Sequence, residues 1–405
     1  MSRFSDIIKT RRLLFDGSMG ALLGQMGFNN ACPDEIALTN PDVIGGIHLR
    51  YINAGANVII CDSFGSTELV LKHKKREGRG ACFTKAAVKV AQRAAGSDVL
   101  VAVDIGPTGE FMRPIGSLSF EEMYNNFYAQ AQVAAAEGVE LAIIETQTDL
   151  AECRAACLAC RAAGLEVIAS FSIGNEGRTL TGSPAECCAL ALEAAGACAV
   201  GLNCSVGPDG MIAPLKAMRR VSPLPVVVQP NAGLPVTDIN GDVSYPFTPE
   251  DMYEGVKKLV EAGAAAIGGC CGTSPKHIRA IKPLTSEPLP QSAYDGVSYV
   301  CSARNFAPIE AALKEVCELT DPEEAYDFED DVTMANIVLD DMDAATAEEF
   351  VLDCCAATKL PLMFTLNNNN SDALEAALRV YPGRAAVRCL DELAQAALKF
   401  GCIRV

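Results

Sequence analysis

The sequence predicts an α/β protein that contains a (β/α)8 TIM barrel over residues 1–287, a linker over 288–293 and a smaller C-terminal α/β domain over 294–405. Two observations predict the barrel. Short runs of apolar and β-branched residues recur along the chain, and each is followed by a longer stretch rich in Ala, Leu and Glu. The short runs are continuously apolar rather than alternating, which is typical of parallel strands buried on both faces.

Eight such runs follow one another, and each ends in a polar or glycine-rich turn. They read LLFDG, ANVIICDSFG, VLVAVDIGPTG, ELAIIETQTD, EVIASFSIG, CAVGLNCSVG, LPVVVQPNAG and AAAIGGCCG. The helical patterns between them suit the crossover connections of a parallel sheet. A doubly wound open sheet is the alternative. The eight repeats, and the lack of a glycine-rich dinucleotide turn after the first run, favour the barrel.

The boundary of the barrel is predicted by composition. The segment IKPLTSEPLPQS is rich in Pro and Ser and ends near residue 293, so it reads as a linker. About 110 residues follow it. A second barrel needs about 250 residues, so we expect a shorter α/β unit there.

Composition also excludes several kinds of partner. The chain has 33 Lys and Arg against 51 Asp and Glu, a net charge of −18. Such a surface repels nucleic acid and anionic lipid, because binding to phosphates depends on Lys and Arg contacts. No apolar run approaches the roughly 20 residues that span a bilayer. Asp16 interrupts the opening apolar stretch, so it does not read as a signal peptide.

Cysteine usage indicates the compartment. The chain has 18 cysteines. Without a secretory signal, this number indicates a reducing compartment, where a local group of thiols binds metal or takes part in catalysis more often than it forms disulfides. We therefore expect a soluble, cytoplasmic protein.

The barrel prediction places a set of polar residues together. In this fold the active site lies at the carboxyl ends of the strands. The residues that fall at those ends are Asp16, Asp62, Asp104, Glu145, Ser172, Cys204, Asn231, Cys270 and Cys271.

Three cysteines among them predict a metal site. Cys204 ends the sixth run, and Cys270 and Cys271 end the eighth. Neighbouring side chains of a regular strand point to opposite faces, but the glycines around the cysteine pair free the backbone to turn both thiols inward. Three thiols and no obvious histidine describe a tetrahedral zinc site with one position open, as in catalytic sites.

The ligand set also predicts the chemistry. Three thiolates give zinc a net charge of −1, which makes it a poor activator of water and a good holder of a fourth thiolate. We therefore expect alkylation of a bound thiol. The alternative is that these cysteines are small core hydrophobes, as cysteines often are; their position between glycines at a strand end favours the metal site.

A second cysteine motif has a different explanation. Cys153, Cys157 and Cys160 have the C-x3-C-x2-C spacing that binds iron–sulfur clusters in radical enzymes that use S-adenosylmethionine. They lie in an Ala-rich helical stretch, where this spacing marks one face of a helix. We expect them to pack in the core, as we do for the pairs Cys187 with Cys188 and Cys354 with Cys355.

Several motifs together resemble a known family. They are DGSMG (16–20), IGPTGEFMRPIGSLSFEEMY (105–124), IIETQTD (143–149), GLNC (201–204), QPNAGLP (229–235) and GGCCGTSPKHIRAI (268–281). In this order they resemble the homocysteine S-methyltransferase family, and most of all the homocysteine-binding module of cobalamin-dependent methionine synthases. The resemblance covers about 280 residues.

The resemblance implies roles for individual residues. Cys204, Cys270 and Cys271 would bind zinc and carry the catalysis, and Asn231 would fill the fourth position until homocysteine displaces it. Asp16 and Glu145 would hold the substrate ammonium, since carboxylates pair with ammonium. Backbone amides of the turn from Gly17 and Ser18 to Gly20 would hold its carboxylate, as helix N-termini do. At CDSFGS (61–66) the family more often has Thr and Asn before the Phe, so the resemblance leaves the role of Asp62 open.

The C-terminal segment carries a weaker resemblance. VLDDMDAATAEEF (338–350) and FTLNNNNSDALEAALRVYPGRAAV (364–387) resemble the start of the methyltetrahydrofolate-binding barrel of methionine synthases. The turn after YPGR reads VRC, where the family tends to have an Asn-containing turn, so we expect a truncated pterin-binding module that has lost folate binding. None of His48, His73 and His277 lies in the D-x-H-x-x-G loop that supplies a histidine to cobalamin.

The expected function is zinc-dependent transfer of a methyl group to the thiol of L-homocysteine, which gives methionine. The expected donor is methylcobalamin on a separate corrinoid protein. Two alternatives stay open: a related enzyme that takes its methyl group from S-methylmethionine or betaine, and a non-catalytic zinc scaffold subunit.

Overall fold

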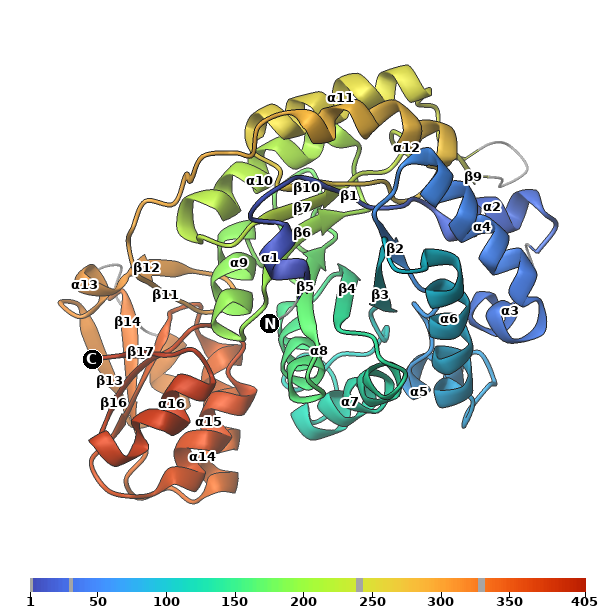
Figure 1. Ribbon diagram of the computed structural model, residues 1–405. Helices are drawn as coiled ribbons and strands as arrows, with labels where there is room; N and C mark the ends of the chain where they lie inside the picture. The colour runs from blue at the N-terminus through green and yellow to red at the C-terminus, as the bar shows by residue number, and fades with distance from the viewer. Residues whose placement is uncertain (1–2, 29–31, 238–242, 327–331) are drawn as a thin grey trace.

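The computed structural model describes residues 3–28, 32–237, 243–326 and 332–405. Within these residues, eight parallel strands form the large sheet (Figure 1). In sheet order they are β1 (Leu13–Leu14), β10 (Ala266–Ile267), β7 (Val226–Gln229), β6 (Ala199–Asn203), β5 (Glu166–Phe171), β4 (Leu141–Gln147), β3 (Leu100–Ile105) and β2 (Val58–Ile60).

The sheet closes into a barrel between its first and last strands. Phe15 forms a parallel bridge with Val58. The Asn57 amide donates to the Leu14 carbonyl oxygen at 2.8 Å, and the Asp16 amide donates to the Val58 carbonyl oxygen at 3.1 Å. Each strand lies in one of the eight runs that the sequence predicts, so the predicted TIM barrel is confirmed.

Helices form the crossovers around the barrel (Figure 1). They are α2 (Met19–Gln25), α3 (Pro33–Thr39), α4 (Pro41–Ala54), α5 (Glu68–His73), α6 (Gly80–Ala95), α7 (Phe120–Ala136), α8 (Leu150–Ala162), α9 (Ala185–Ala194), α10 (Pro208–Val221), α11 (Pro249–Ala262) and α12 (Pro275–Ile281), with the 3-10 helix η1 (Lys282–Ser286) after them. Several begin at a side-chain cap: Ser119 and Glu122 form a capping box at α7, and Thr248 and Asp251 form one at α11. A short antiparallel pair, β8 (Val236–Thr237) and β9 (Val243–Ser244), precedes α11.

The interior of the barrel is apolar at its amino end. Leu13, Val58 and Ile143 are fully buried there, in a cluster of residues from the barrel strands. Helix α1 (Arg3–Ile7) covers this end, and its Phe4 ring meets Phe15 edge to face at 6.5 Å. Apolar packing therefore fills the bottom of the barrel, and the polar residues lie at the opposite end.

The C-terminal part forms a second α/β unit. Among the described residues, five parallel strands make its sheet in the order β13 (Val316–Leu319), β14 (Met334–Val338), β15 (Leu362–Leu366), β16 (Ala386–Cys389) and β17 (Ile403–Arg404). An antiparallel pair, β11 (Tyr299–Cys301) and β12 (Phe306–Pro308), precedes them. The helices are α13 (Ile309–Ala312), α14 (Ala344–Ala357), α15 (Ser371–Val380) and α16 (Ala394–Lys399), with the 3-10 segments η2 (Pro322–Tyr326) and η3 (Asp391–Leu393).

This unit packs against the flank of the barrel beside α8 and α9 (Figure 1). Arg154 on α8 is 2% exposed and donates to the carbonyl oxygens of Leu378 and Arg379, both at 2.8 Å. An ion pair of 2.6 Å joins Arg379 to Glu121 on α7. The predicted smaller α/β unit is therefore present. The domain boundaries at 287 and 294 stay a prediction, although η1 ends at Ser286 and β11 begins at Tyr299.

No helix in the described part of the chain is both long enough and apolar enough to cross a lipid bilayer.

Candidate metal centre and substrate pocket

The structure brings together the three cysteines that the sequence singled out. Their sulfur atoms all lie within 4.8 Å of one another, at the carboxyl ends of β6 and β10. Cys204 Sγ lies 3.7 Å from Cys271 Sγ, and Cys270 Sγ lies 4.0 Å from Cys271 Sγ. Residues 66 positions apart in the chain therefore meet at one point because strand ends converge in a barrel.

Local backbone geometry turns the thiols toward each other. Cys204 has φ +59°, the left-handed conformation that redirects the chain at the end of β6. After the cysteine pair, Gly272 has φ +75°, and a Cβ atom there would lie 2.3 Å from the Tyr245 ring. Only glycine fits this position without displacing the tyrosine. The Cys270 amide donates to the Pro230 carbonyl oxygen at 2.9 Å, which fixes the loop to the end of β7.

Two asparagines brace the thiols. Asn231 Oδ1 accepts a hydrogen bond of 3.0 Å from the Cys271 amide. Asn203 Nδ2 lies 3.8 Å from Cys270 Sγ, and Asn203 Oδ1 accepts from the Thr146 amide at 2.8 Å. Asn231 therefore holds the cysteine loop in this structure, while its predicted role as a fourth ligand stays a prediction. The bracing by Asn203 was not predicted from the sequence; its position directly before Cys204 was the available signal.

The thiols also set one another's protonation. Hydrogen bonds from Cys270 and Cys271 lower the pKa of Cys204 to about 2. The hydrogen bond with Cys204 in turn raises the pKa of Cys271 to about 11. It also raises the pKa of Cys270. These contacts favour a thiolate at Cys204 over one at Cys270 or Cys271. A cation placed among the sulfur atoms would ionise the other two thiols as well.

These residues fit a zinc ion. In tetrahedral zinc sites the Zn–S distance is about 2.3 Å, which places the sulfur atoms about 3.8 Å apart. The measured separations of 3.7 and 4.0 Å lie close to that value. Sulfur ligands also select soft and borderline metals such as zinc over magnesium or calcium.

Carboxylates form a second group of side chains in the same pocket, which has a volume of about 320 Å³. Asp16 follows β1, Asp62 follows β2, Asp104 lies near the end of β3 and Glu145 lies in β4. Burial raises the pKa of each of these four groups, that of Glu145 to about 7. Ser172 also follows a strand, but it is not among the described residues that line this pocket.

The turn after β1 is packed tightly against the cysteine loop. Asp16 is 3% exposed, and its Oδ2 accepts from the Ile60 amide at 3.0 Å. A Cβ atom at Gly17 would lie 2.6 Å from Thr273 Oγ1. The Ser18 amide donates to Thr273 Oγ1 at 3.1 Å, and Ser18 Oγ caps α2 through the Ala21 amide. The turn thus lines the pocket, where the Ser18 amide is already paired with Thr273. Its predicted contact with the substrate carboxylate stays a prediction.

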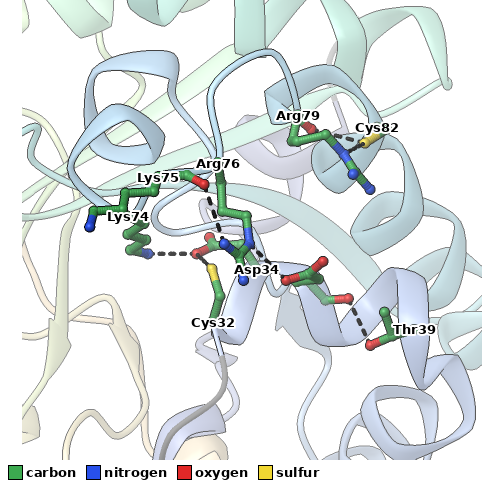
Figure 2. A network of polar contacts seen from close by, with 9 residues as sticks. Cys32, Asp34, Thr39, Lys74, Lys75, Arg76, Arg79 and Cys82 are labelled. Atoms are coloured by element: carbon green, nitrogen blue, oxygen red, sulfur yellow. Dashed lines mark hydrogen bonds and ion pairs between the residues drawn. The ribbon is translucent and has the colours of Figure 1, made fainter.

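A polar network holds the pocket wall between β2 and α5 (Figure 2). Asp34 is 2% exposed and accepts from Lys74 Nζ at 2.7 Å, while Cys32 Sγ lies 3.7 Å from its carboxylate. Its other oxygen accepts from the Gly65 amide at 2.7 Å. Asp34 therefore fixes the loop that carries Phe64, another residue of the pocket wall. The sequence does not predict this network, because nothing in the spacing of Asp34 and Lys74 indicates their contact.

The other conspicuous cysteines lie elsewhere. Cys153, Cys157 and Cys160 lie on α8 and are fully buried. The prediction that their spacing marks a buried helix face is confirmed.

Comparison with known proteins agrees with this geometry. The family model for homocysteine S-methyltransferase matches residues 13–285, which is most of the barrel. The chain belongs to the homocysteine S-methyltransferase family. The resemblance inferred from the motifs is thereby confirmed.

Relatives of this family member extend the comparison. Methionine synthase of Mycobacterium tuberculosis is 27% identical over 433 residues, which cover 95% of this chain and 36% of that protein. Methionine synthase of Mycobacterium leprae is 29% identical over 302 residues, which cover 68% of this chain and 25% of that protein. The chain thus spans about a third or less of the length of these relatives. The first match continues well beyond the barrel into the C-terminal unit.

A solved structure supports the fold. The metallated form of the homocysteine methyltransferase MmuM from Escherichia coli superimposes with a TM-score of 0.59 at 24% identity. The match covers 69% of this chain and 98% of that one.

Proposed function

We propose that this family member transfers a methyl group to the thiol of L-homocysteine and forms methionine. The observation that carries the proposal is the lining of the pocket, which three sulfur atoms spaced for zinc share with a group of carboxylates. Homocysteine has a thiol at one end and an ammonium group at the other. The two groups of side chains match these two ends.

The proposed metal is one Zn²⁺ held by Cys204, Cys270 and Cys271. When bound there, zinc would lower the pKa of a substrate thiol, so that thiolate persists at neutral pH. Asn203 and Asn231 keep the cysteine loops in place, as outer partners of metal ligands do.

The carboxylates of the pocket and the turn at Gly17 would orient the substrate. Asp16 and Glu145 would accept hydrogen bonds from its ammonium group, and backbone amides of the turn at Gly17 would meet its carboxylate. The substrate sulfur would then attack an electrophilic methyl carbon. The new S–C bond forms as the bond between that carbon and the donor breaks, and the product thioether is a weak ligand that leaves.

The proposed donor is methylcobalamin on a separate corrinoid protein. The relatives are methionine synthases, and the match to one of them extends past the barrel. The histidines of this chain are engaged in contacts within the chain or lie in its core, rather than in a loop that could bind cobalamin. His73 Nε2 contacts Glu110 at 2.9 Å, His277 caps α12 and contacts the Phe247 carbonyl oxygen, and His48 is buried within α4.

An assay with four donors tests the proposal. Purified, zinc-loaded protein is given homocysteine and one isotope-labelled methyl donor: free methylcobalamin, methyltetrahydrofolate, S-methylmethionine or betaine. Mass spectrometry then measures labelled methionine. We expect product with methylcobalamin and none with methyltetrahydrofolate alone. Product with S-methylmethionine or betaine would replace the corrinoid donor by a small one, and no product with any donor would contradict the enzymatic function.

A further inference from the structure

Asp104 is a pocket residue whose main-chain groups are hydrogen-bonded, whereas its side chain keeps a buried oxygen atom without a partner in the described part of the structure. Its amide donates to Ser63 Oγ at 3.1 Å, and its carbonyl oxygen accepts from Ser63 Oγ and from Gln130 Nε2, both at 3.0 Å. The side chain is 6% exposed and lines the substrate pocket. Within the described residues, its buried Oδ1 atom has no hydrogen-bond partner.

An unpaired buried carboxylate oxygen is costly, because it gives up its hydration and receives nothing in return. Three contacts on the main chain of Asp104 keep the residue in this position nevertheless. Other carboxylates make the position still less favourable, since Glu145 and Asp16 repel the charge of Asp104 and, together with burial, raise its pKa. This arrangement is suited to a cationic ligand that donates hydrogen bonds.

The described lining of the pocket supplies no unpaired cation for Asp104. Among the described residues that line the pocket, Lys74 is the one basic side chain, and it pairs with Asp34 at 2.7 Å. A cation that pairs with Asp104 would therefore come with a ligand.

We propose that Asp104 is a third carboxylate that binds the primary ammonium group of the substrate, together with Asp16 and Glu145. This inference rests on the proposed function. A primary ammonium group has three N–H donors, so three carboxylates match it. Asp16 can accept only part of the hydrogen bonds that the ammonium group donates, because its Oδ2 already accepts one from the Ile60 amide. The pocket would thus select thiols that carry a free amino group.

The test compares two thiols that differ only in the amino group. Isothermal titration measures binding of L-homocysteine and of 4-mercaptobutanoate, its analogue without the amino group, to zinc-loaded full-length protein. Asp104→Asn should weaken homocysteine binding about tenfold to a hundredfold, as expected for loss of a charge-assisted hydrogen bond. Binding of 4-mercaptobutanoate should stay within about twofold of wild type or become tighter.

Glu152→Gln is the matched control. Glu152 is also buried, but its Oε1 accepts from the Thr108 amide and hydroxyl, both at 2.6 Å, and it does not line the pocket. This variant should bind both thiols like the wild type. Asp104→Ser is a second variant in case the asparagine misfolds, and it should show the same selective loss.

The outcomes separate the two claims. Wild-type affinity of Asp104→Asn for homocysteine, or an equal loss for both thiols in both variants at this position, would overturn the role of Asp104. Failure of the wild-type protein to bind homocysteine would instead overturn the proposed function, and this inference with it.

Discussion

The two walls of the pocket are built in opposite ways. On the thiol wall, Cys204, Cys270 and Cys271 contact one another, and Asn203 and Asn231 brace them. On the carboxylate wall, Asp62 and Asp104 are buried with an oxygen atom that has no partner among the described residues. The three sulfur atoms of the thiol wall surround a space that fits one metal ion. The carboxylate wall keeps hydrogen-bond acceptors with which the N–H groups of a ligand could pair.

Both walls favour positive charge, but of different kinds. Sulfur ligands favour a soft metal ion, whereas carboxylates pair with an ammonium group. Because of this difference, one barrel mouth could hold a small amino thiol in a single direction, with its sulfur at the thiols and its amino group at the carboxylates. Variants on each wall should therefore fail in different ways.

The largest effect is expected on the thiol wall. Replacing Cys204, Cys270 or Cys271 singly by Ala removes a sulfur ligand and should reduce methyl transfer below detection, because the remaining pair cannot hold the metal and activate the substrate thiol. The measurement is labelled methionine formed from homocysteine and methylcobalamin. Circular dichroism should show that the barrel stays folded.

The matched control replaces Cys153, Cys157 and Cys160 together by Ala. These thiols are packed on α8 away from the pocket, so this variant should retain activity while losing some thermal stability. Full activity in any single Cys→Ala variant of the thiol wall would contradict the proposal that all three thiols are needed for methyl transfer.

A smaller effect is expected on the carboxylate wall. Asp16→Asn and Glu145→Gln keep the shape of the side chains and remove their charge. Each should weaken homocysteine binding about tenfold to a hundredfold, because a charge-assisted hydrogen bond to the ammonium group is lost. Isothermal titration measures the affinity, and zinc content measured in parallel should stay at the wild-type level. Unchanged affinity in both variants would remove these residues from the substrate site.

The smallest effect on the pocket is expected from Glu152, which lies outside both walls. Burial raises its pKa to about 7 from an ordinary value near 4.5. The folded protein therefore holds this proton more tightly than the unfolded chain does. The stabilisation is fully present below pH 4.5 and is lost as the pH rises through about 7.

The shift in pKa corresponds to roughly 3 kcal/mol of unfolding free energy. Glu152→Gln cannot titrate, so it should lack this part of the pH dependence while homocysteine affinity stays unchanged. Urea unfolding of both proteins between pH 4.5 and pH 8 measures the difference. Parallel curves for the two proteins would show that Glu152 is ionised throughout.

Much of this architecture is predictable because it depends on local patterns. Continuous apolar runs predicted the strands, and barrel topology then placed Cys204 beside Cys270 and Cys271 without any knowledge of distances. The glycines around the cysteine pair predicted an irregular backbone, and Gly272 indeed has a positive φ.

Other features depend on contacts that no spacing predicts. Asn203 reaches Cys270 across 67 positions, and Lys74 meets Asp34 across 40. The sequence placed Asp104 at a strand end but gave it no role. Its unpaired oxygen becomes visible only when the surrounding side chains are in place. Strand ends can thus be predicted from a sequence, whereas the hydrogen-bond partners that decide the role of each residue cannot.

The proposed metal centre is tested most directly by the metal content of freshly purified, reduced protein, measured by inductively coupled plasma mass spectrometry. The wild type should contain about one zinc ion per chain, and the variant with Cys204, Cys270 and Cys271 all replaced by Ala should contain almost none. Wild-type protein without zinc, or a triple variant that retains it, would contradict the proposal that these three thiols form the metal centre.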